Sequence, residues 1–314
     1  LEDYFHTLEA LHLLEPAKGT ESELFALLEQ QVLAFYDPLT HTYYEIDTPP
    51  SAEAAAIPPS LIAIHELTHA LQDQRFAIGQ RDRELRDDWD AGLAYHAVIE
   101  GEATLVMLAA LTDGILPLDV LVENDLLRTK MAEAAQSDLL AVADAPRYFV
   151  ESLKFPYLAG LNFVMDAYKR GGWKAVDQLH QRPPRSTREV LHPEEYVSRM
   201  KEGTAEPAVV HTLPNGTRPF LDQQLGEFHW AFLLGEESTR GLRADRVSVI
   251  HDAFCQPTVL VETRWDTESQ AEAFRSRYER FLVDREKLVE VVRRGKVVRA
   301  AYGADAVLAE RFLR

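Results

Sequence analysis

The stretch "IHELTHALQDQRF", residues 64–76, places His65, Glu66 and His69 in the pattern H-E-x-x-H. Residues four apart on a helix lie one turn apart on the same face, so the two imidazoles point in one direction. This spacing allows both rings to bind one Zn²⁺ at about 2.0–2.1 Å. Glu66 is too close to His65 to bind the same ion easily, but it can act as a general base toward a water activated by the metal.

The surroundings of the pattern favour a metal over a chance pair of solvent-facing histidines. The segment "LIAIHELTHAL" is apolar on nearly every other face, which predicts a buried helix. Burying polar side chains without partners costs several kcal/mol, and a metal ion would satisfy all of them. The segment therefore predicts a metal-binding helix.

A hydrolytic zinc site needs three protein ligands and one open position. The third ligand is predicted in "AYHAVIEGEATLVMLAAL", where Glu100 shares a helical face with Ala97 and Thr104. Glu102 fits better at a helix edge in water. His96, one turn before Glu100, could also reach the site, although a lone histidine is more often structural.

These two segments resemble the gluzincin branch of zinc metallopeptidases. "HELTHALQD" is very similar to the active-site helix of thermolysin-like enzymes, and "IEGEAT" resembles the E-G-x-A pattern of aminopeptidase-type gluzincins, whose first Glu binds zinc. The resemblance implies that His65, His69 and Glu100 hold one Zn²⁺. The spacing to the third ligand is longer than in the thermolysin-like members, and their calcium signatures are not apparent. This likeness covers about 45 residues.

A wider likeness joins "FYDPLTHTYYEI", "HALQDQRF", "VIEGEATLVM", "FPYLAGLNFV" and "PPRSTREVLHPEEY". Together these segments resemble a family of largely uncharacterised bacterial and archaeal metallopeptidases, over about residues 30–200. The resemblance implies a zincin-like peptidase fold and gives no substrate.

Peptide hydrolysis also needs a donor for the oxyanion of the transition state. His192 is the first candidate, because it ends a short helix opened by Ser186 and a helix C-terminus favours a protonated imidazole. The alternative is a histidine on a surface loop. Tyr196 and Tyr157 are further candidates, although a Tyr in "FPY" is more often a packing residue. Asp73, one turn after His69, either orients an imidazole or is a solvated or capping residue near the helix end.

The elements around the site form an α+β pattern. We predict a mainly helical, zincin-like domain with a small edge sheet over residues 1–203, and a small α+β unit of unknown role over residues 204–314. The strand "HTYYEID" is a candidate edge along which an extended peptide could lie, or else part of a core hairpin.

Helical periodicity, caps and breakers predict the individual elements. The predicted helices cover residues 1–15, 21–28, 60–79, 83–111, 118–143, a segment opening near Pro156, and residues 222–235. Ser186 with Glu189 fits a capping box. In the last unit, Asp266 or Thr267 is predicted to cap a long amphipathic helix, and a hairpin turn is predicted at Arg294 and Gly295.

Composition limits the partners. The net charge of −18 disfavours binding to nucleic acid and to anionic membranes. The sequence contains no run of 18 apolar residues, so we predict no membrane span. With Cys255 as the single cysteine, the chain can form no internal disulfide and no cysteine zinc site. It opens directly into "LEDYFHTLEALHLLE", which we interpret as a mature or trimmed chain, so that export, localisation and oligomeric state stay open.

The sequence thus predicts a zinc metallopeptidase with Glu66 as general base and peptide or protein as substrate. No G-x-M-E-N segment for gripping a free N-terminus is present, which favours an endopeptidase. One alternative is a zinc hydrolase of non-peptide amides; deformylases, however, take a cysteine ligand upstream of H-E-x-x-H, and Cys255 lies downstream. The other is a catalytically silent metal-binding or scaffold protein, for which Glu66 would have no use.

Overall fold

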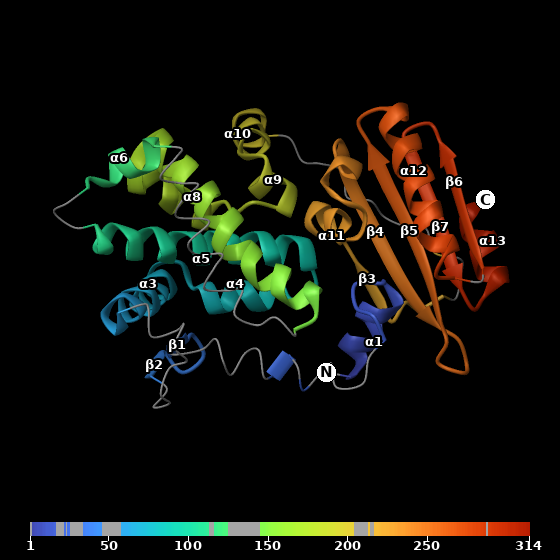
Figure 1. Ribbon diagram of the computed structural model, residues 1–314, viewed down its shortest axis with the longest axis horizontal. Helices are drawn as coiled ribbons and strands as arrows, with labels where there is room; N and C mark the ends of the chain where they lie inside the picture. Colours follow the sequence, from blue (N-terminus) through green and yellow to red (C-terminus); the bar gives the residue numbers. More distant parts are fainter. Residues whose placement is uncertain are drawn as a thin grey trace. The chain divides into compact units, whose positions relative to one another are not determined.

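The chain folds into two compact units of α+β structure, which are described separately (Figure 1). The computed structural model describes residues 2–16, 22, 24–25, 34–45, 58–112, 116–124, 145–203, 213, 217–286 and 288–314. The helical unit comprises Ala17–Arg86 and Ala91–Ser198, and the sheet unit comprises Leu1–Pro16, Asp87–Asp90 and Arg199–Arg314.

The helical unit carries the H-E-x-x-H segment. Its described elements are β1 (Ala34–Asp37), β2 (Thr42–Glu45), α3 (Pro59–Phe76), α4 (Ile78–Glu84), α5 (Trp89–Leu111), α6 (Leu118–Glu123), α8 (Arg147–Gln181), α9 (Thr187–Leu191) and α10 (Pro193–Glu202). The first turn of α5 and the end of α10 belong to the sheet unit. Strands β1 and β2 pair antiparallel as a two-stranded sheet. Most of the predicted helices over residues 21–28 and 118–143, and most of the Pro-rich stretch before α3, lie outside the described residues.

Helix α3 begins and ends at other residues than predicted. Pro58 is its N-cap, two residues before the predicted start, and Pro59 occupies the first turn, where its missing N–H costs nothing. The helix ends at Phe76 because Ala77 adopts the left-handed conformation (φ 52°) and donates its N–H to Asp73 O. Gly79, the last residue of the predicted helix, lies inside α4.

Two further helices differ from the prediction. The predicted helix over residues 83–111 is split, since α4 ends at Glu84 and α5 begins at Trp89. Helix α8 begins at Arg147, so Pro156 lies in its interior, and Gly171 and Gly172 break its helical geometry.

Helices α5 and α8 touch through two glycines. A Cβ added to Gly101 would lie 2.4 Å from the backbone of Gly160, and one added to Gly160 would lie 2.1 Å from Ala97 O. Only residues without a side chain permit this approach. The crossing brings Glu100, next to Gly101, toward Tyr157, one turn before Gly160.

Helix α5 is apolar because it is a core helix of the unit. Among the described residues it is the one helix long and apolar enough to cross a membrane, and 61% of its most apolar window is buried inside the protein. Ala94, Tyr95, Ala97 and Val98 are fully buried. Burial within the protein accounts for its composition.

The sheet unit is built on a five-stranded antiparallel sheet of order β3-β4-β5-β7-β6. Its elements are α1 (Glu2–Ala10), β3 (Leu221–Gln223), α11 (Gly226–Leu234), η2 (Glu236–Ser238), β4 (Leu242–His251), β5 (Pro257–Trp265), α12 (Glu268–Val283), β6 (Val289–Arg294), β7 (Val297–Gly303) and α13 (Ala306–Leu313). Thr267 begins α12 with a complete capping box, and Gly295 (φ 59°) forms the β6–β7 turn, as predicted. The predicted helix over residues 222–235 is instead strand β3 followed by α11.

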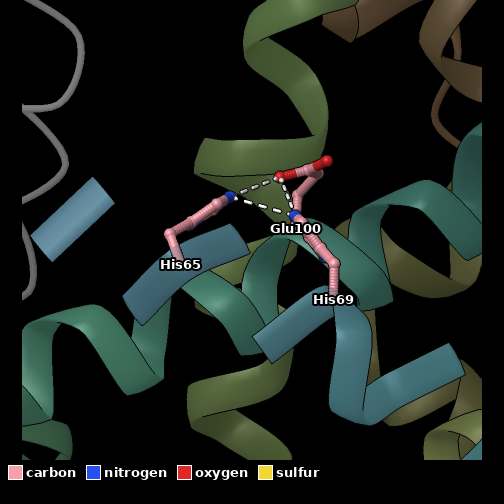
Figure 2. A group of neighbouring side chains, drawn as sticks. All are labelled: His65, His69 and Glu100. Atoms are coloured by element: carbon pink, nitrogen blue, oxygen red, sulfur yellow. Dashed lines mark hydrogen bonds and ion pairs between the residues drawn. The ribbon is translucent and has the colours of Figure 1, made fainter. Parts of the chain in front are cut away.

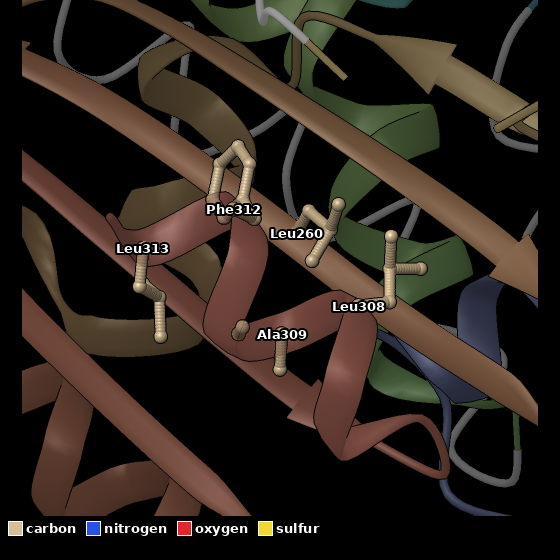
Figure 3. Close-up of a cluster of buried hydrophobic side chains, with 6 residues drawn as sticks. Leu260, Leu308, Ala309, Phe312 and Leu313 are labelled. Carbon is tan, nitrogen blue, oxygen red and sulfur yellow. The ribbon is translucent and has the colours of Figure 1, made fainter. Parts of the chain in front are cut away.

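Side chains of the central strands alternate between two covered faces. On one face, Leu260 and Ala301 pack against Leu308, Phe312 and other residues of α13 (Figure 3). On the other, Trp265 and Tyr302 contact Phe274 and Tyr278 of α12. Burial of both faces makes this sheet an independent core.

The N-terminal helix belongs to the sheet unit, although the predicted boundary placed it with the motif. The ring of His12 stacks on Tyr302 at 5.6 Å, and Tyr302 donates its hydroxyl to Ala10 O. Leu8 and Leu11 are buried. Contacts between residues nearly 300 positions apart therefore decide this assignment, and local sequence cannot reveal them.

Candidate metal centre

The structure brings His65, His69 and Glu100 together into one group (Figure 2). Helix α3 supplies both histidines, and α5 supplies the glutamate. Each residue offers one ligand atom, and the three atoms lie within 4.8 Å of one another. We call these three residues the triad.

The spacing of the triad fits a tetrahedral metal ion. Ligand atoms at about 2.0–2.1 Å from such an ion are about 3.3–3.4 Å from each other. The two imidazole Nε2 atoms are 3.2 Å apart, and Glu100 Oε2 is 3.1 Å from His65 Nε2 and 3.6 Å from His69 Nε2. Two imidazoles and one carboxylate are also a donor set that zinc hydrolases use.

The charges of the triad are strongly coupled. Burial opposes protonation of His69, but the adjacent Glu100 carboxylate raises the pKa of the imidazole to about 9. Burial likewise opposes ionisation of Glu100, and the charge of His69 and hydrogen bonds from both histidines outweigh it and lower the pKa of the carboxyl group. The site therefore holds an ionised carboxylate that favours a positive charge beside it, which the proton of His69 supplies in the absence of a metal ion.

Helix α3 is not the apolar buried helix that the sequence predicts. Its buried residues are all polar, namely His65, Thr68, His69, Gln72 and Asp73. Leu67 and Leu71 are more than half exposed. Apolar content alone does not say which face of a helix is buried. The polar face turned inward carries a heavy desolvation cost unless its groups are satisfied.

Glu66 is held beside the triad by strand β1. Its Oε2 accepts a hydrogen bond of 2.9 Å from the backbone N–H of Tyr36. Burial raises the pKa of Glu66, opposed by the neighbouring histidines and this hydrogen bond. The strand whose backbone reaches the site is thus β1, whereas the sequence pointed to "HTYYEID", which contains β2.

Asp73 anchors the β1–β2 hairpin to α3 and is not bonded to a triad imidazole through its described contacts. Its Oδ2 accepts from the Tyr36 hydroxyl at 3.0 Å and lies 2.9 Å from His41 Nδ1. Its Oδ1 accepts from Gly79 N at 3.2 Å. Asp73 therefore fixes strand β1, which holds Glu66. The sequence suggested either a residue that orients an imidazole or a solvated or capping residue, and the observed role is neither of these alone.

Tyr157 lies at the triad. Its ring stacks on the imidazole of His65, with centroids 6.0 Å apart and planes at 22°. The charge of Glu100, followed by burial and a hydrogen bond to Glu100, raises the pKa of the hydroxyl well above its ordinary value. Tyr157 therefore stays protonated at neutral pH, and its hydroxyl donates to the Glu100 carboxylate. Sequence reasoning favoured a packing role for this residue.

A second buried polar group lies behind the triad, and sequence reasoning missed it. Glu102 was predicted at a helix edge in water, but it is 8% exposed and bonds Gln72 and His180 at 2.7 Å each. The partners come from α3 and α8, so only the packing of three helices brings them together. The polar side chain of Glu102 inside an apolar stretch was the one available signal.

Three other candidates have different surroundings. His96 is half exposed, and its Nε2 lies 2.8 Å from Asp82 Oδ1 on α4, outside the triad. His192 caps the C-terminus of α9, as predicted, and its Nδ1 lies 3.9 Å from a carboxylate oxygen of Glu194. Tyr196 is buried and donates its hydroxyl to Arg182 O at 2.8 Å, which is a packing role.

The short helix α9 begins after its N-cap Ser186 and ends at its C-cap His192. Ser186 is its N-cap and accepts from Glu189 N, as predicted. Glu189 Oε2 accepts from Arg185 N, not from Ser186 N, so only half of the predicted capping box forms.

Comparison with known proteins adds no family to this description. The chain matches no protein-family model, no curated protein and no solved structure. The resemblance to gluzincins and the wider resemblance over residues 30–200 remain predictions from the sequence.

Proposed function

We propose that the protein is a zinc-dependent metallopeptidase whose triad of His65, His69 and Glu100 holds one Zn²⁺. The single observation that carries the proposal is the geometry of the three ligand atoms, which are spaced 3.1–3.6 Å apart. A purely structural zinc site has four protein ligands, and the described residues supply three. The resulting open position is where substrate and water would react.

Glu66 is the proposed general base. When bound, the zinc ion acts as a Lewis acid toward water and the substrate carbonyl. Glu66 takes a proton from the attacking water while the water oxygen forms a bond to the carbonyl carbon of the substrate. The same carboxyl group then gives that proton to the amine nitrogen as the C–N bond breaks. The Tyr36 N–H on Oε2 holds the carboxylate in place and leaves Oε1 for this transfer.

The substrate is proposed to be an extended peptide beside strand β1. The N–H of Tyr36 points toward Glu66 and not toward β2, so this edge of β1 faces the site. A peptide aligned along such an edge is bound through its backbone, which suits an endopeptidase of broad sequence preference.

Tyr157 is the proposed oxyanion donor, in preference to His192. We expect Tyr157→Phe to lower kcat by about 10²-fold with little change in KM, because the lost hydroxyl acts mainly on the transition state. Steady-state kinetics on a fluorogenic peptide measures both constants. His192→Gln is the matched comparison, and a larger loss of kcat there than in Tyr157→Phe would transfer the role to His192.

The proposal is tested with quenched fluorescent peptides of mixed sequence. The zinc-loaded protein is expected to cleave internal peptide bonds, to lose this activity with a chelator and to regain it with added zinc. If the zinc-loaded protein cleaves no peptide in a broad library, the peptidase assignment fails. Cleavage of simple non-peptide amides alone would point to the other class of zinc hydrolase.

A further inference from the structure

The side chain that orients His69 is Gln72, and its amide can adopt only one orientation. Gln72 Nε2 lies 3.0 Å from Ile99 O and 2.7 Å from Glu102 Oε2. A backbone carbonyl and a carboxylate both accept hydrogen bonds, so the NH₂ end of the amide must face them. Gln72 Oε1 then faces His69 Nδ1 at 2.8 Å as an acceptor.

This orientation fixes the tautomer of His69. Because Gln72 Oε1 can only accept, His69 Nδ1 must carry a proton. A neutral His69 ring then has its free electron pair on Nε2, the nitrogen that lies 3.2 Å from His65 Nε2 within the triad. The amide therefore presents His69 in the form that binds a metal ion.

Glu102 is itself held rigidly on its far side. Its Oε2 lies 2.7 Å from His180 Nε2, and His180 is 1% exposed. The His180 ring stacks on Phe76 at 4.4 Å with planes 5° apart, and its Nδ1 lies 3.4 Å from the Tyr95 hydroxyl. The contacts run from α8 through α5 to α3, so the packing of three helices determines where the amide of Gln72 points.

We propose that Gln72, Glu102 and His180 form a positioning chain that holds His69 in its Nδ1–H tautomer and thereby sets the affinity of the triad for zinc. The proposal rests on zinc binding by the triad, which is part of the proposed function, and does not depend on the reaction catalysed. Residues that orient metal-bound histidines contribute about 10–100-fold to metal affinity.

The test compares zinc affinities, measured by competition with a chelating dye. Gln72→Met removes the acceptor at similar volume, and Glu102→Leu removes the group that orients the amide. Both are expected to lower zinc affinity about 10–100-fold. Glu102→Gln can place its amide oxygen where Oε2 lies, and there it accepts from both Gln72 and His180, so this variant is expected to stay within about threefold of the wild type.

Tyr196→Phe is the matched control for stability, because it also removes one buried hydrogen bond in the helical unit. It is expected to lower the unfolding midpoint without changing zinc affinity. A structural readout complements these affinities. In the zinc-loaded wild type, NMR should detect an exchange-protected Nδ1–H proton on His69, and Gln72→Met should lose it.

The outcomes separate this inference from the proposed function. The positioning chain is overturned if folded Gln72→Met binds zinc as tightly as the wild type does. It is also overturned if the wild type lacks the protected Nδ1–H proton on His69. If Gln72→Met fails to fold, Glu102→Leu against Glu102→Gln decides by the same criterion. If the variants change zinc affinity as expected but the protein cleaves no peptide, the positioning chain is upheld and the peptidase assignment is overturned. A wild type that binds no zinc overturns both.

Discussion

Glu66→Gln is expected to reduce peptide cleavage by about 10²–10⁴-fold while zinc stays bound. The substitution keeps the size of the side chain and its acceptor oxygen for the Tyr36 N–H. It removes the ability to take up and release a proton during the reaction. Since Glu66 is not one of the triad ligands, the zinc content of the purified variant should equal that of the wild type.

The measurement is kcat/KM on a fluorogenic peptide together with zinc content per chain. Glu84→Gln is the matched control, because it makes the same change of charge at an exposed position of α4 in the same unit. Full activity in Glu66→Gln would contradict its role as base. Loss of zinc together with activity would instead make Glu66 a residue that holds the site together.

Gly101→Ala is expected to destabilise the helical unit by about 1–3 kcal/mol and to weaken zinc binding. The added methyl would lie 2.4 Å from the backbone of Gly160 and 2.9 Å from Leu161 N. Backbone atoms cannot rotate away as a side chain can, so α5 and α8 must separate. That movement would displace Glu100, the residue next to Gly101, from the two histidines.

Gly92→Ala on the same helix is the matched control. A Cβ there would meet Leu85 O at 3.5 Å, an ordinary contact, so the higher helix propensity of alanine should stabilise α5 by up to about 1 kcal/mol. Chemical denaturation of both variants with and without zinc measures the two effects. An unchanged unfolding midpoint in Gly101→Ala would show that the two helices do not touch as described.

The triad could be predicted because short sequence segments carry the signals for its residues. The spacing of His65 and His69 follows from helical periodicity, and Glu100 stood out as a carboxylate on an apolar helix. The same locality explains the C-terminal unit, where Thr267 and the turn at Gly295 mark the ends of elements. Caps, turns and spacing depend on neighbours in sequence, and the predictions at Thr267, at Gly295 and for the two histidines agree with the structure.

The surroundings of the triad could not be predicted, because they depend on packing. The partners of Glu102 lie 30 and 78 positions away, and Glu66 is bound by a backbone N–H that carries no side-chain signal. Tyr157 reaches the triad because Gly101 and Gly160 let two helices touch. A glycine in a helix reads as a weak position in sequence, and its role in a close crossing becomes visible only in three dimensions.

Titration of the metal-free protein with zinc tests the central claim most directly. We predict that one equivalent binds per chain with a Kd well below 1 μM, and that Glu100→Ala weakens binding by at least about tenfold because it removes one of three ligands. Glu84→Ala should bind as the wild type does. Absence of stoichiometric binding, or full affinity in Glu100→Ala, would contradict the assignment of His65, His69 and Glu100 as the zinc ligands.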